Sequence, residues 1–119
     1  MQERDLEKIL VDEVKKAGGI AYKWVSPGND GVPDRIVILP GMPVQFVELK
    51  VHSGKPTKLQ KVQMDRLEKL GQRVFLSRGL FGLEAFFLSV GMTSAADKVR
   101  GLFDEELRRH TKKKREVNV

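Results

Sequence analysis

Apolar and polar positions along the chain follow two periods, and each period predicts one kind of element. Near the N-terminus, Leu6, Leu10 and Val14 recur at helical spacing, and Gly18-Gly19 ends the pattern. Short apolar runs bounded by turn-forming residues predict strands. The predicted helices cover residues 3–17, 57–70, 80–90 and 94–107, and the predicted strands cover residues 20–25, 34–39, 44–51 and 73–77.

The order of these elements, α-β-β-β-α-β-α with a C-terminal extension, predicts an α/β fold: a small mixed β-sheet flanked by helices. The strands at 34–39 and 44–51 are joined by a tight Pro-Gly connection, which predicts a hairpin. Thr57 and Gln60 have the spacing of a capping box at the start of a helix. The apolar face of that helix is predicted to contain Leu59, Val62, Leu67 and Leu70.

The predicted helix at 80–90 is apolar on nearly every side. In a small domain this pattern favours burial on two sides, with a second subunit as one candidate partner. We therefore expect Phe81, Phe86 and Phe87 to form the contact surface of a homodimer. The alternative is burial within one chain, beneath the C-terminal helix.

Composition narrows the possible classes of protein. The 119 residues suffice for one domain, and the absence of cysteine excludes disulfides, a thiolate nucleophile and a zinc site with Cys ligands. Two histidines argue against a His-rich metal site. Neither a membrane span nor a secretory signal is visible, so we expect a soluble, cytoplasmic protein with no membrane partner.

Positive charge is concentrated near the C-terminus. The net charge is +6, and the run at 108–115 (RRHTKKKR) holds six basic residues and no acidic ones, so the rest of the chain is formally neutral. Such a run suits a polyanion, because binding releases counterions from phosphates. The alternative is a solvated, disordered end.

Two opposite charges share one face of the strand predicted at 44–51. Side chains alternate along a strand, so Glu48 and Lys50 point to the same side as Phe46. The strand is otherwise apolar enough to be buried, and buried charges need compensation. Glu48 and Lys50 either pair with each other or hold a metal ion and a phosphate.

Asp34 favours the second interpretation. It opens the neighbouring strand, and the hairpin should bring it close to Glu48 and Lys50. Two converging carboxylates suit a hard cation such as Mg²⁺ or Mn²⁺. With an adjacent lysine, they form a set suited to hydrolysis of a phosphodiester bond.

These residues also carry a family resemblance. The string Gly31-Val32-Pro33-Asp34, fourteen residues before Glu48-Leu49-Lys50, resembles the signature of PD-(D/E)XK nucleases. The context, including Gly54-Lys55-Pro56 and Leu59-Gln60, resembles the virus-type replication-repair branch, the VRR-Nuc domain, in its stand-alone phage or bacterial form. The resemblance covers roughly residues 3 to 77 and implies a restriction-endonuclease-like α-β-β-β-α-β core.

The resemblance implies a role for each matching residue. Asp34 and Glu48 match the metal-binding carboxylates, Lys50 the catalytic lysine, and Gln60 a glutamine near the site, although Gln60 could serve only the capping box. The family also uses a glutamate of the first helix, and spacing does not choose between Glu3 and Glu7. The candidate DNA contacts are Lys23, Arg35 and Lys55, with a solvated position the alternative for Lys23 and a salt bridge the alternative for Arg35.

The resulting hypothesis is a Mg²⁺- or Mn²⁺-dependent DNA endonuclease without a small-molecule cofactor. We expect it to act as a homodimer on four-way (Holliday) junctions or other branched DNA in replication, repair or recombination, in the cytoplasm of a bacterium or a phage-infected host cell. Residues 1–91 are the predicted nuclease domain and 92–119 a C-terminal helix with a basic tail. Two alternatives remain: a non-catalytic nucleic-acid-binding module, and a structural protein with a buried Glu48–Lys50 pair.

Overall fold

A computed structural model describes residues 1–117 and contains all eight predicted elements. Two residues of the predicted C-terminal extension, 118 and 119, lie outside the described residues. The helices are α1 (Glu3–Lys16), α2 (Lys58–Lys69), α3 (Gly79–Ser89) and α4 (Thr93–Val117). The strands are β1 (Ile20–Lys23), β2 (Arg35–Ile38), β3 (Gln45–Lys50) and β4 (Arg73–Arg78).

The four strands form one mixed sheet in the order β1-β2-β3-β4. The pairs β1–β2 and β2–β3 are antiparallel, which confirms the predicted hairpin, and β3–β4 is parallel. A parallel pair needs a crossover connection, and α2 provides it. The predicted α/β fold with a small mixed sheet is therefore confirmed.

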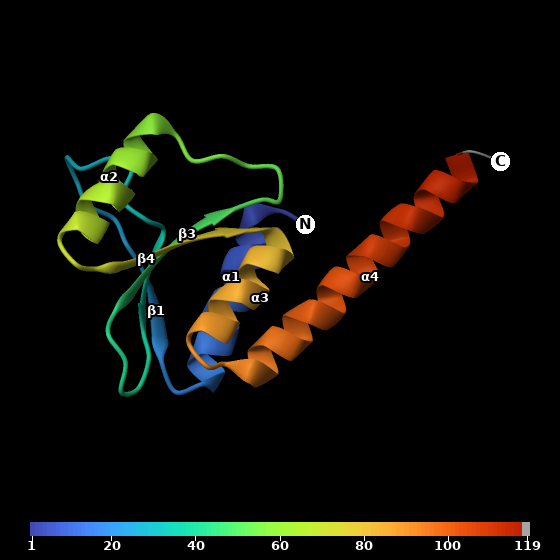
Figure 1. Cartoon of the computed structure of the whole chain (residues 1–119), viewed down its shortest axis with the longest axis horizontal. Coiled ribbons are helices and arrows are strands. Elements are labelled where there is room, and N and C mark those ends of the chain that lie inside the picture. Colours follow the sequence, from blue (N-terminus) through green and yellow to red (C-terminus); the bar gives the residue numbers. More distant parts are fainter. Residues whose placement is uncertain (118–119) are drawn as a thin grey trace.

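The helices cover the two faces of the sheet unequally (Figure 1). On one face, α1 and α3 pack side by side over Val37, Val47 and Leu49, which are almost completely buried. This layer holds the main hydrophobic core. The opposite face carries α2 near β4, and the rest of that face holds the site described below.

The prediction of which α2 residues face the core is mostly wrong. The helix buries Met64 and half-buries Leu67, whereas Leu59, Val62 and Leu70 remain exposed. The prediction failed because, among the described elements, α2 packs chiefly on β4, and its other apolar side chains stay exposed. The predicted capping box is confirmed: the amides of Gln60 and Thr57 donate to the side-chain oxygens of Thr57 and Gln60, at 3.1 and 2.8 Å.

The predicted dimer surface also needs correction. Phe86 and Phe87 are fully buried within the chain, where α3 meets the sheet, α1 and α4, so they cannot contact a second subunit. Phe81 is 59% exposed and contacts Phe103 of α4, with the rings tilted by 52° and their centroids 6.2 Å apart. The intrachain alternative is thus correct for two of the three phenylalanines.

Helix α4 is longer than the pattern predicts. Its first half is anchored to the core through buried Ala96 and Val99, and Lys98 donates to the buried Glu13 carboxylate of α1 at 3.2 Å. The helix then continues to Val117 and projects away from the body, so the basic run lies on a helix and not in a disordered end (Figure 1). Lys, Arg and Glu favour helices and no Gly or Pro follows Gly101, which accounts for the extension. Within residues 1–117, no helix is long and apolar enough to cross a membrane.

Candidate active site

The β2–β3 hairpin brings the three central candidates together. The register pairs Arg35 with Val47, so Asp34 lies beside Glu48 at the next position. Asp34, Glu48 and Lys50 then share the sheet face opposite α1 and α3, because side chains alternate along each strand. Asp34 is fixed there by a 2.8 Å hydrogen bond that its Oδ2 accepts from the backbone amide of Leu49.

Glu48 is the most unusual group in the site. Its side chain is 1% exposed, and its only salt-bridge partner among residues 1–117 is Lys50, with 3.3 Å between Nζ and Oε2. The contact lacks hydrogen-bond geometry, and among the described residues neither carboxylate oxygen has a hydrogen-bond donor. Burial, together with the negative charge of Asp34, raises the pKa of Glu48 to about 7, against the opposing effect of Lys50.

The two candidate glutamates of α1 have different surroundings. Glu7 accepts from the Arg35 guanidinium at 2.6 Å from Nη2 and 2.9 Å from Nε, while Arg35 also donates to the carbonyl of Ala21. Glu3 forms no ion pair within residues 1–117; partial burial and the nearby Asp34 carboxylate raise its pKa, and Lys50 lowers it. The structure thus places Glu3 in the electrostatic field of the site and commits Glu7 to a salt bridge.

The loop before Asp34 rests directly on the start of α2. Gly31 has φ +87°, and a Cβ at this position would lie 2.8 Å from the backbone carbon of Leu59. Only glycine tolerates both the left-handed backbone and this approach. Gln63 strengthens the contact by donating to the Asp30 carbonyl at 3.2 Å. The side-chain oxygen of Gln60 is used by the capping box, so a role for Gln60 in the site stays a prediction.

The predicted DNA contacts are scattered. Lys23 is exposed on the edge strand β1 and Lys55 is exposed in the loop before α2, whereas Arg35 is held by Glu7 and Ala21. Arg78 was not among the predicted site residues, and the parallel β3–β4 register places it beside Lys50. Its place directly after the strand predicted at 73–77 was a usable signal, but the pairing partner of that strand was not visible in the sequence.

The donor set fits a divalent cation that takes part of its coordination from outside the protein. Within residues 1–117, no group of three or more Asp, Glu or His side chains is gathered closely enough to hold a metal ion. Asp34 and Glu48 supply two carboxylates, and Mg²⁺ is commonly bound by one or two carboxylates plus water and substrate phosphate. The buried Glu48 oxygens without donors are what a cation at this position would satisfy.

Comparisons with known proteins identify similar proteins among the nucleases. No family model matches the chain. The chain is 51% identical over 76 residues to "Putative nuclease p44" of Acyrthosiphon pisum secondary endosymbiont phage 1, an alignment that covers 64% of this chain and 82% of the phage protein. A solved structure described as a VRR_NUC domain superposes with a TM-score of 0.62 at 27% identity, covering 86% of this chain and 94% of that one. The chain therefore belongs to the VRR-Nuc family of nucleases.

Proposed function

We propose that this protein is a divalent-metal-dependent DNA endonuclease that acts on branched DNA, with a four-way junction as the first candidate substrate. The observation that carries the proposal is the buried Glu48 carboxylate, which has no hydrogen-bond donor among the described residues and lies next to Asp34 and Lys50. A structural ion pair would be expected to satisfy its carboxylate, so the arrangement is better suited to a site completed by a ligand.

Each residue has a separate task in the proposed reaction. Asp34 and Glu48 would hold Mg²⁺ or Mn²⁺, with Glu3 or Glu7 as the candidate assisting carboxylate, and Glu3 favoured because Glu7 is committed to Arg35. The ion would polarise the phosphate and stabilise the charge that develops on its oxygens. Lys50, 15% exposed, can donate a hydrogen bond to the attacking water or to a phosphate oxygen as negative charge grows.

A homodimer is part of the proposal because a junction presents two strands for cleavage, and a symmetric pair of chains presents two sites. The remaining exposed apolar side chains of α3 and α4 are the candidate contact, namely Phe81, Leu88 and Leu107. Light scattering of the purified protein tests this point, and a monomeric mass at the concentration used for cleavage would contradict it.

The central test is cleavage of a labelled four-way junction and of a linear duplex with the same arms, in Mg²⁺, Mn²⁺ or EDTA. Replacing Lys50 by Ala should reduce junction cleavage by about a hundredfold or more, as for loss of one stabilising donor. Lys15→Ala, at an exposed lysine of α1, is the matched control and should leave cleavage unchanged. Equal cutting of both substrates would contradict the proposed junction preference. Undiminished cutting by Lys50→Ala would contradict the proposed role of Lys50.

A further inference from the structure

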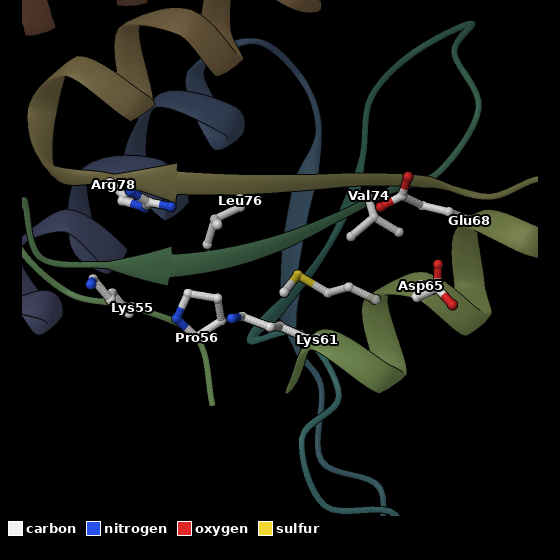
Figure 2. A pocket seen from close by; sticks show the side chains of 9 residues that line it. Lys55, Pro56, Lys61, Asp65, Glu68, Val74, Leu76 and Arg78 are labelled. Carbon is white, nitrogen blue, oxygen red and sulfur yellow. The ribbon is translucent and has the colours of Figure 1, made fainter. Parts of the chain in front are cut away.

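A groove of about 390 Å³ runs between α2 and β4 on the same sheet face as the candidate active site (Figure 2). Its apolar floor is made by Met64, Val74 and Leu76, and charged side chains stand at both ends. None of the residues that line it takes part in the proposed cleavage chemistry, and Lys55 alone among them is a predicted DNA contact.

The register of the sheet makes this groove continuous with the site. In the parallel β3–β4 pair, Glu48 is opposite Leu76 and Lys50 is opposite Arg78. Directly paired residues of neighbouring strands point to the same face. The groove therefore begins one strand away from the two central groups of the candidate active site.

Charge is distributed unequally along the groove. Figure 2 shows Lys55 and Arg78 at the end where β3 and β4 finish, with the Lys61 amine directed toward the same end, and Asp65 and Glu68 at the other. Within residues 1–117, neither these two lysines nor Arg78 takes part in an ion pair. Arg78 also lies beside Lys50, so the basic end of the groove adjoins the candidate active site.

We propose that this groove binds the DNA strand next to the bond that is cleaved. Arg78 and Lys61 hold a backbone phosphate, and the apolar floor contacts the adjoining sugar and base. An anionic ligand at the basic end supplies a counter-charge for Arg78. At the other end Asp65 is paired with Lys69 at 2.8 Å, and Glu68 repels phosphates and so limits how far the strand extends. The inference rests on the proposed function for the identity of the substrate strand.

The first test is DNA binding without metal, so that it does not depend on catalysis. Fluorescence anisotropy in EDTA, over a series of KCl concentrations, compares the unsubstituted protein with the Arg78→Gln, Lys61→Gln double variant. We expect Kd to rise about tenfold and the slope of log K against log salt to shrink by about 0.9 for each phosphate that the variant no longer neutralises. The control, Arg66→Gln with Lys15→Gln, removes one arginine and one lysine from exposed positions outside the groove and should change Kd by less than about twofold.

A second variant tests the acidic end of the groove. Its expected effect is a gain of affinity, which misfolding would not produce. Glu68→Gln should tighten binding by about two- to fivefold, because it removes a negative charge from the path of a polyanion. Asp97→Asn, at an exposed position on α4, is the matched control. A gain of affinity of this size from Glu68→Gln alone supports the proposed strand path, and an equal effect of both substitutions overturns it.

The remaining outcomes separate the two proposals. If the Arg78 and Lys61 double variant binds DNA as its control does, or if the unsubstituted protein does not bind DNA, the groove assignment is wrong. If binding depends on the groove but no metal supports cleavage, the groove assignment stands and the proposed endonuclease function fails. In steady-state cleavage, the double variant should raise KM and leave kcat within about twofold, because these residues bind substrate without touching the reacting atoms.

Discussion

The Asp34 carboxylate accepts a 2.8 Å hydrogen bond from the backbone amide of Leu49, the residue between Glu48 and Lys50. The antiparallel β2–β3 ladder ends at the Arg35–Val47 pair, so this side chain satisfies an amide of β3 that lies beyond its last partner in β2. The bond ties the loop that carries Asp34 to the strand that carries the other two central groups. It gives Asp34 a structural role in addition to its proposed catalytic role.

Two substitutions should separate these roles. Asp34→Ala leaves the Leu49 amide without its acceptor and should lower the free energy of unfolding by about 1–2 kcal/mol. Asp34→Asn keeps an acceptor oxygen and should cost less, yet it removes the carboxylate and should abolish cleavage as fully as alanine does. Urea unfolding and junction cleavage, measured on the same preparations, check the prediction; an active Asp34→Asn variant would contradict it.

Glu48 should make the metal-free protein less stable as pH rises. Burial and the Asp34 charge raise the folded-state pKa from 4.5 to about 7, so between these values the folded protein retains a proton that the unfolded chain releases. Stability then falls as pH increases through this window, by on the order of 3 kcal/mol in total. Glu48→Gln stays neutral and should lose this contribution, which melting curves in EDTA at pH 5 and pH 8 can measure.

As a control, the same melting curves are recorded for Glu68→Gln, which removes an exposed carboxylate. Added Mn²⁺ should raise the melting temperature of the unsubstituted protein at pH 8, because a ligand that binds only the folded state stabilises it. Glu48→Gln should respond much less. Parallel pH profiles for Glu48→Gln and the unsubstituted protein would contradict the buried-carboxylate explanation.

Gly31 should tolerate no side chain. Gly31→Ala places a Cβ 2.8 Å from the backbone carbon of Leu59 in a left-handed conformation, and should cost about 2–4 kcal/mol from strain and steric overlap. Gly28 is the matched control: its φ is +80°, but within residues 1–117 no atom beyond its immediate chain neighbours lies within 4 Å of the Cβ position. Gly28→Ala should therefore cost only about 1–2 kcal/mol. Chemical denaturation of the two variants makes the comparison, and equal losses of stability would show that the contact with α2 is unimportant.

The projecting half of α4 should contribute non-specific affinity for DNA. Its basic run is exposed on a helix that stands clear of the body, so lysine side chains there can reach phosphates without moving the core. Replacing Lys112, Lys113 and Lys114 by Gln should weaken binding at low salt and reduce the salt slope by about 0.9 for each phosphate that is no longer neutralised. Replacement of Lys8, Lys15 and Arg66 by Gln controls for net charge. An unchanged slope in the α4 variant would show that the run does not bind DNA.

Local pattern accounted for most of the fold and for the centre of the site. Alternation in 44–51 places Glu48 and Lys50 on one face, and the tight turn before it returns the chain so that Asp34 lies beside them. Capping signals located the start of α2, and glycines marked the ends of α1 and α2. These features depend on neighbours close in sequence, which is why the sequence alone determined them.

Tertiary contacts decided the rest. Glu3 and Glu7 are equivalent by helical spacing. Only the packing of α1 on the sheet pairs Glu7 with Arg35 in a salt bridge and leaves Glu3 near Asp34. The apolar periodicity of α2 did not reveal how little of its surface the sheet would cover. The parallel pairing that sets Arg78 beside Lys50 joins residues far apart in the chain. Periodicity encodes which face of an element is apolar, whereas the partner that covers that face is selected by the packing of the whole molecule.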